Sequence, residues 1–135
     1  MIRRLIMALA VVAGALCACA QDSSIEEIVA EAAKACPVAL DRGNTLETVK
    51  LADDAVEIHL VMALPAAQFS MLEQSVDMLR PTMLKVLLTD SNMRNVAAKT
   101  AASGRGLRII LICRDDRNTT FTIAYTPTEL SDALK

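Results

Sequence analysis

A run of nine residues with strict alternation constrains the fold of this chain more than any other feature. Between Val56 and Leu64 every second side chain is large and apolar, whereas the intervening set includes Glu57 and His59. Successive side chains of a strand point to opposite faces, so a period of two predicts a strand with one core-facing row. We expect Glu57, His59 and Val61 to lie together on the other face of this strand.

The sequence predicts two hairpins. In the first, Leu46–Leu51 precedes the alternating run and is joined to it by Ala52–Ala55. In the second, Leu107–Cys113 and Thr119–Tyr125 flank the polar segment Arg114–Asn118. Strands that are joined by short polar turns pair in the antiparallel sense, so we expect antiparallel pairing in both hairpins.

Helical patterns occupy most of the remaining chain. Ser24 begins a capping-box pattern, and the helix that follows it should stop at Pro37. The spacing of apolar residues predicts further helix from Ala66 to Ser103, broken or kinked at Arg80–Pro81. Thr126–Glu129 combines a Thr cap, a Pro and a Glu in the positions that open a short final helix.

This order of elements predicts an α+β fold. We expect a two-layer sandwich with about four antiparallel strands, arranged as two hairpins, and with helices on one face of the sheet. Residues 25–135 form the single predicted domain, and residues 19–24 form a short tether before it.

The first twenty residues have the layout of an export signal. Arg3 and Arg4 precede an apolar stretch of 16 residues from Leu5 to Ala20. That stretch is slightly shorter than the roughly 17–25 residues of a membrane-spanning helix, which favours a signal peptide over residues 1–18. An uncleaved membrane anchor is the alternative.

Two cleavage sites are compatible with this signal. Residues 16–19 read Leu-Cys-Ala-Cys, which is similar to a bacterial lipobox, and they predict cleavage before Cys19 and lipid attachment to its thiol. Residues 18–20 read Ala-Cys-Ala, an ordinary signal-peptidase pattern that predicts cleavage before Gln21 and a free secreted protein. Both alternatives place the chain outside the cytoplasm, either lipid-anchored at a bacterial envelope or soluble in the periplasm or medium.

Charge and aromatic content exclude one large class of partner. Removal of the signal leaves 12 basic against 16 acidic groups, a net charge of −4. The chain has two Phe, one Tyr and no Trp. An acidic surface repels phosphate backbones, and three rings are too few for a base-stacking platform, so we expect no nucleic-acid partner.

Two cysteines remain beyond the signal. Cys36 and Cys113 predict one disulfide if the mature protein resides in an oxidising compartment. Two separate buried thiols are the alternative, because sequence does not give the distance between them. The chain has no C-x-x-C pair, no spaced calcium loop and one histidine, so we expect no metal and no cofactor.

One group of known proteins has a similar sequence pattern. The lipobox-like segment at Cys19, the segment Ala35–Val49 and the final segment Tyr125–Leu130 together resemble small exported bacterial lipoproteins of uncharacterised function. The resemblance implies an envelope location and an α+β fold. It implies no catalytic residue.

No catalytic motif accompanies these features. His59 lacks a partner that the sequence marks, and a solvated or partner-facing histidine is the alternative to a catalytic base. Arg105, Arg108, Arg114 and Arg117 predict a basic patch near one end of the second hairpin, which is either a solvated cluster at the strand ends or a surface for an acidic partner. We therefore expect no catalytic residues.

The leading hypothesis for function is a non-enzymatic binding or assembly module. It would contact another envelope protein through the sheet face that carries Glu57, His59 and Val61. An inhibitor or immunity-type protein, and a small envelope enzyme with an unmarked site, are the alternatives, since a small α+β fold is compatible with all three.

Overall fold

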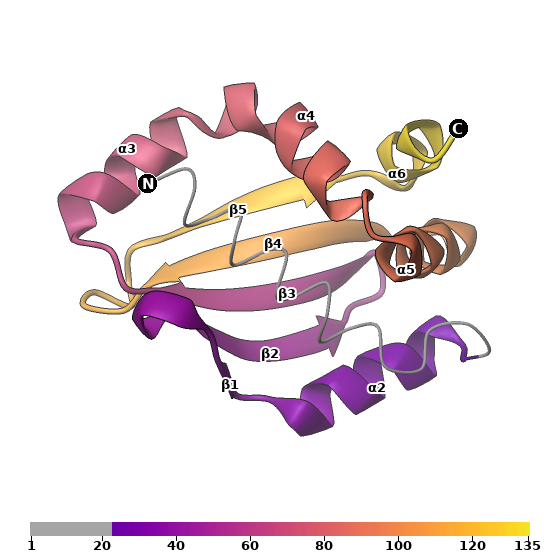
Figure 1. Cartoon of the computed structure of the whole chain (residues 1–135), viewed down its shortest axis with the longest axis horizontal. Coiled ribbons are helices and arrows are strands. Elements are labelled where there is room, and N and C mark those ends of the chain that lie inside the picture. The colour runs from indigo at the N-terminus through magenta and orange to yellow at the C-terminus, as the bar shows by residue number, and fades with distance from the viewer. Residues whose placement is uncertain (1–22) are drawn as a thin grey trace.

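The structure is a computed structural model and describes residues 23–135. It contains five helices and one five-stranded sheet (Figure 1). The elements follow the order α2 (Ile25–Ala35), β1 (Val38–Ala39), a 3₁₀ turn (Asp41–Gly43), β2 (Thr45–Leu51), β3 (Ala55–Met62), α3 (Ala66–Gln74), α4 (Val76–Leu87), α5 (Ser91–Ala102), β4 (Gly106–Cys113), β5 (Thr120–Tyr125) and α6 (Pro127–Ala133). The predicted signal peptide, the cleavage sites and Cys19 lie outside the described residues.

The sheet has the strand order β1-β2-β3-β4-β5. Both predicted hairpins are confirmed, because β2 pairs antiparallel with β3 and β4 pairs antiparallel with β5. The α+β class is also confirmed, but the sheet has one more strand than expected, and β3 pairs parallel with β4. The parallel pair arises because α3, α4 and α5 separate the two strands, so the chain crosses back before β4 begins.

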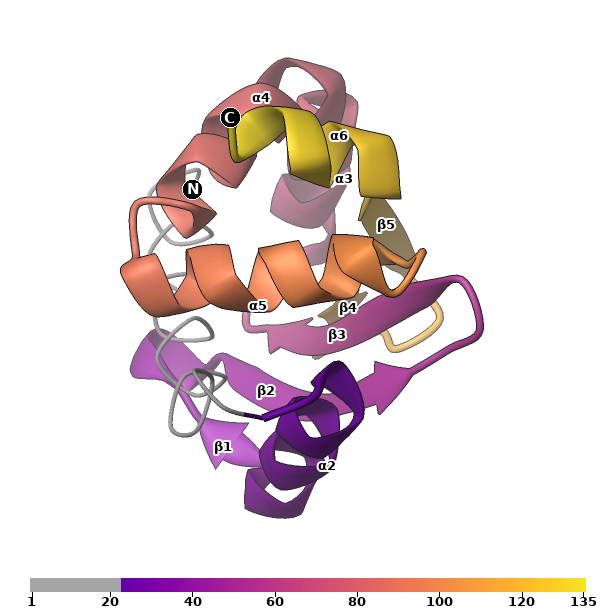
Figure 2. The same ribbon diagram turned by 90° about the vertical axis from the view of Figure 1, so that its right-hand side faces the viewer.

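The large apolar side chains of the alternating run lie in the core, as predicted. Ile58, Leu60 and Met62 of β3 are completely buried. Buried residues from all five helices join them in one cluster, which includes Val29, Phe69, Leu84, Met93 and Leu130. Figure 1 shows α3 and α4 on the β5 side of the sheet and α2 on the β2 side. Figure 2 shows α5 running between α2 on one side and α4 and α6 on the other.

The helical region after β3 divides at a different residue from the one predicted. The break lies at Ser75, between α3 and α4, and α4 continues through Pro81. The Ser75 hydroxyl donates a hydrogen bond to Met71 O at 3.1 Å, and its N–H donates to Leu72 O at 3.1 Å. These local bonds close the last turn of α3, and a serine side chain that bonds to the backbone competes with helix continuation.

Cys36 and Cys113 are both free thiols, so the predicted disulfide is absent. Burial raises the pKa of the Cys36 thiol, which lies within hydrogen-bond reach of the Val49 backbone. Val49 pairs with Ile58 in the sheet. Cys113 lies on β4 and pairs with Met62 of β3. Met62 is four residues beyond Ile58 along β3, and β4 is one strand farther from β2 than β3 is. At about 3.3 Å per strand residue, this separation exceeds the roughly 7 Å between Cα atoms that a disulfide tolerates.

The predicted helix starts are present. The Ser24 hydroxyl accepts a hydrogen bond from the Glu27 N–H at 3.2 Å, and Thr126 with Glu129 forms a complete capping box at the start of α6. Gly104 follows α5 with a φ of 78°, a left-handed conformation that glycine adopts without steric cost. Within residues 23–135, no helix has the length and apolar character required to cross a membrane.

Candidate functional site

The candidate site lies on the face of the sheet that points away from the core, which we call the outer face. Strand pairing arranges its side chains in three rows, each of which crosses β2, β3, β4 and β5. The first row is Lys50, Glu57, Arg108 and Ala124; the second is Thr48, His59, Ile110 and Thr122; the third is Thr45, Val61, Ile112 and Thr120. Glu57, His59 and Val61 share this face, as the alternating pattern predicted.

Arg108 is the centre of the first row. Its Nε and Nη2 donate to the Glu57 Oε2 at 3.1 and 2.7 Å, and its Nη1 donates to the Asp54 Oδ2 at 3.0 Å. The Asp54 and Glu57 hydrogen bonds raise the pKa of Arg108, and the Arg108 hydrogen bond lowers the pKa of Asp54. These three side chains therefore form a charged network whose geometry is fixed by two strands and a turn.

His59 extends this network along β3. Its Nε2 lies 3.2 Å from the Glu57 Oε1, and the two side chains are 17% and 20% exposed. Burial would raise the pKa of Glu57, but hydrogen bonds from His59 and Arg108 outweigh burial and hold that pKa below its usual range. The imidazole is therefore oriented by a carboxylate that stays ionised at neutral pH.

A nucleophile is not bonded to this imidazole in the described structure. Thr48 pairs with His59 in the sheet, but the hydrogen-bond partner of the His59 ring among residues 23–135 is Glu57. A catalytic base abstracts a proton that lies within about 2.6–3.2 Å, directly or through one water, from a nucleophile, a substrate or water. The contact with Glu57 orders His59 within the polar outer face.

A second ion pair joins β2 to the turn between β4 and β5. The pairing of β2 with β3 shifts register between Leu46 and Thr48, which leaves Glu47 as an extra, bulged residue. Glu47 accepts a hydrogen bond from Arg117 Nη2 at 2.6 Å. Because Arg117 lies in the turn between β4 and β5, this pair ties β2 to that turn across β3. Val61 is only 6% exposed, so it contributes little accessible surface.

A cleft of about 440 Å³ adjoins the first row where β5 ends and α6 begins. Its lining includes the charged residues Arg108 and Asp54 of the first network, Arg80 of α4 and Glu129 of α6. The other residues that line the cleft are Ala55, Gly104, Gly106, Ala124, Tyr125, Thr126 and Pro127. A volume of this size lies within the range of small-molecule sites.

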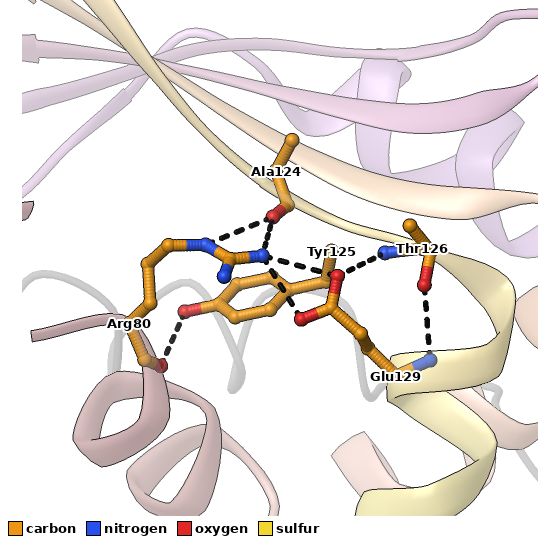
Figure 3. A network of polar contacts seen from close by, with 5 residues as sticks. All are labelled: Arg80, Ala124, Tyr125, Thr126 and Glu129. Atoms are coloured by element: carbon orange, nitrogen blue, oxygen red, sulfur yellow. Dashed lines mark hydrogen bonds and ion pairs between the residues drawn. The ribbon is translucent and has the colours of Figure 1, made fainter. Parts of the chain in front are cut away.

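Arg80 is held by groups from β5 and α6, as Figure 3 shows. Its Nε donates to Ala124 O at 3.2 Å, its Nη2 also donates to Ala124 O, and the same Nη2 lies 3.0 Å from the Glu129 Oε2. The guanidinium lies 5.0 Å from the ring centroid of Tyr125, whose hydroxyl donates to Arg80 O at 2.8 Å. Cation–π contact and charged hydrogen bonds together restrict the guanidinium to one position.

Two pKa values in this network are shifted. The hydrogen bond from the Thr126 backbone lowers the pKa of Glu129, and Arg80 lowers it further. Burial raises the pKa of Tyr125 to about 12. At neutral pH the Glu129 carboxylate is therefore ionised, and the Tyr125 hydroxyl stays protonated and donates its hydrogen bond.

The four arginines of the possible basic patch do not gather at one place. Arg105 and Arg108 lie at the start of β4, whereas Arg114 and Arg117 follow its end. Each contacts a carboxylate: the Arg105 Nη1 lies 3.8 Å from Glu26, and the Arg114 Nε lies 3.4 Å from Asp115. Arg108 and Arg114, the nearest members of the two pairs, are six residues apart along the chain, which is about 20 Å at the usual rise per strand residue. The four arginines are therefore paired with carboxylates at the two ends of β4 and form no single cluster.

Metal ligands are not clustered in the part of the chain that the structure describes. There, no group of three or more His, Cys, Asp and Glu side chains is arranged to hold a metal ion. The charged groups of the site are paired with one another instead.

Replacement of Glu129 by Gln tests the charge of the Arg80 network. A carboxyl group with a lowered pKa stabilises the fold above the pKa of an unfolded glutamate, about 4.3, and this contribution is lost as pH falls through the folded pKa. Gln can keep the capping-box hydrogen bond, so Glu129→Gln removes mainly the charge. We expect the variant to be less stable at pH 7 by less than about 1 kcal/mol, with a difference that disappears in acid. Urea unfolding over a pH series measures this, and a difference that is constant or grows towards low pH would contradict the account.

Comparison with known proteins gives one structural likeness. No protein-family model and no curated protein matches the sequence. The fold is similar to the crystal structure of a protein from Pseudomonas aeruginosa described as "a putative secreted protein". The match has a TM-score of 0.61 at 12% identity and covers 82% of this chain and 89% of that chain. At this identity the likeness shows that the two chains share a fold.

Proposed function

We propose that this chain is an exported protein, held at a bacterial envelope by lipid on Cys19, which binds another envelope protein without catalysing a reaction. The export-signal pattern and the lipobox-like residues support the location. The description of the Pseudomonas aeruginosa protein with a similar fold as "a putative secreted protein" is consistent with it. The outer face is the proposed binding surface.

The single observation that carries this proposal is the ordered charge pattern of the outer face. Arg108, Glu57, Asp54 and His59 already contact one another in the free protein. Side chains that are fixed before binding lose less conformational entropy when a partner docks. A fixed pattern of both signs also selects a partner whose charges complement it and disfavours other proteins.

Ile110 provides the apolar component of the same surface. It lies beside His59 in the second row and is partly exposed, whereas Val61 is almost covered. Protein interfaces commonly have an apolar centre surrounded by a polar rim, and Ile110 among polar neighbours has this arrangement. We therefore assign Ile110, together with Glu57 and His59, to the contact surface.

Two substitutions on the outer face test the binding surface. Glu57→Lys reverses the charge between His59 and Arg108, and Ile110→Glu places a charge in the apolar centre without removing an ion pair. We expect each variant to reduce chemical cross-linking to the envelope partner in cells by at least about tenfold. Asp132→Lys is the matched control, because Asp132 is an exposed, ion-paired carboxylate on α6. The proposal is wrong if both outer-face variants keep every cross-link of the unchanged protein.

The proposed lipid anchor on Cys19 is tested by measuring the intact mass of the protein purified from native membranes. We expect a chain that begins at Cys19 and carries a lipid-sized increase in mass, because a diacylglycerol on the thiol provides the attachment. Cys19→Ser should release the protein from the membrane fraction. A chain that begins at Gln21 and has no added mass would contradict the anchor and leave the binding surface to be tested in the soluble protein.

A further inference from the structure

One side of β5 has no neighbouring strand in the described part of the chain, so β5 forms a free edge of the sheet (Figure 1). In an antiparallel pair, residues whose N–H and C=O groups bond to the neighbouring strand alternate with residues whose groups point away from it. The N–H of Cys113 donates to Thr119 O at 3.0 Å, so Thr119 and every second residue after it bond to β4. The backbone groups of Thr120, Thr122 and Ala124 therefore point outward at the free edge.

Arg80 closes one end of this edge. Its Nε donates to Ala124 O at 3.2 Å, and its Nη2 donates to the same oxygen, which confirms that this carbonyl points away from β4. Among residues 23–135, the backbone N–H and C=O groups of Thr120 and Thr122 have no hydrogen-bond partner, and both residues are exposed. The open part of the edge is therefore the segment from Thr120 to Thr122.

This open segment lacks the features that keep edge strands apart. Free edges are commonly protected by Pro, by Lys or by a bulge. β5 contains no Pro and no Lys, and its pairing with β4 has no shift of register. Thr and Phe are residues that strands favour. An extended strand can therefore pair with Thr120 and Thr122 without displacing Arg80.

The open segment is complementary to itself. Thr120 and Thr122 each offer one backbone donor and one backbone acceptor. Two copies related by a twofold axis at Phe121 pair Thr120 of each copy with Thr122 of the other through reciprocal hydrogen bonds, as in an antiparallel sheet. Threonine side chains that face each other across such a pair also stabilise it. A second copy of this chain therefore satisfies the backbone groups of the open segment.

Charges beside the open segment favour the same arrangement. In this register Ala124 lies opposite Asn118 of the second copy, which brings Arg80 next to the turn that precedes β5 in that copy. The Asp116 carboxylate of this turn accepts hydrogen bonds from Asn118 N–H and the Thr119 hydroxyl, and it has no cationic partner within residues 23–135. Opposite charges that meet across an interface favour the correct partner and register.

We propose that the free edge of β5 is a self-association site, at which two copies of this chain pair Thr120 with Thr122 and join their sheets. Antiparallel pairing about a twofold axis keeps both outer faces on the same side of the joined sheet. The inference is independent of the proposed partner at the outer face, because the edge groups and the outer-face side chains are different sets.

Sedimentation velocity of the protein purified from cells in mild detergent tests the association. A contact over so short a segment is smaller than a standard interface, so we expect a reversible dimer with a Kd between about 10 µM and 1 mM. A protein that stays monomeric throughout this concentration range would overturn the proposal. So would a monomer that pairs its β5 edge only with a different protein.

Three variants separate the edge from other surfaces. Thr122→Pro removes an N–H that points away from β4, so the bonds between β4 and β5 are kept while the dimer weakens by about tenfold or more. Thr122→Val is the matched control, because it keeps the N–H and should still dimerise. Ile110→Glu changes the outer face and should also leave the dimer intact. Dimerisation of Thr122→Pro like that of the unchanged protein, or its loss in Ile110→Glu, would contradict the edge contact.

Mixed cysteine variants test the register and decide the matter if Thr122→Pro does not fold. Residues that pair directly across antiparallel strands have Cα atoms about 5.5 Å apart, which a disulfide can span. We expect Thr120→Cys mixed with Thr122→Cys to form a disulfide-linked dimer under mild oxidation at least about tenfold faster than either variant alone. Equal rates for the mixture and the single variants would show that this register is wrong.

Discussion

The parallel pairing of β3 with β4 is the interaction on which the other features of this structure depend. Parallel neighbours cannot be joined by a tight turn, so the chain between them forms α3, α4 and α5 and supplies helical residues to the core. The register of the same pair places Glu57 beside Arg108 and His59 beside Ile110. One pairing therefore determines both how the core is covered and which side chains meet on the outer face.

Both guanidinium groups of the site are positioned by segments that are distant in sequence. Arg108 of β4 is held by Glu57 of β3 and by the turn before that strand, whereas Arg80 of α4 is held by β5 and α6. Each arginine therefore links elements that the chain does not connect directly. Their fixed positions give the outer face and the adjoining cleft a defined arrangement of charges.

Local patterns predicted β2, β3, β4 and β5 and the outer-face residues, but they missed β1 and the long-range contacts. A period of two identified β3 and the common face of Glu57, His59 and Val61, because alternation is a property of one strand. The parallel neighbour of β3 depends on how three helices return the chain, which no local spacing encodes. Arg80 was missed as a site residue for a similar reason, since its partners Ala124 and Glu129 are more than forty residues away. The prediction of a disulfide between Cys36 and Cys113 was wrong, because the number of cysteines does not give the distance between them.

The central claim, that the outer face contacts an envelope protein, is tested most directly by site-specific photo-cross-linking in cells. A photoreactive residue in place of Ile110 lies at the centre of the second row, and the same residue in place of Asp132 lies on α6. The account predicts a light-dependent adduct of defined mass from position 110 and none from position 132. No adduct from position 110, or the same adducts from both positions, would contradict it.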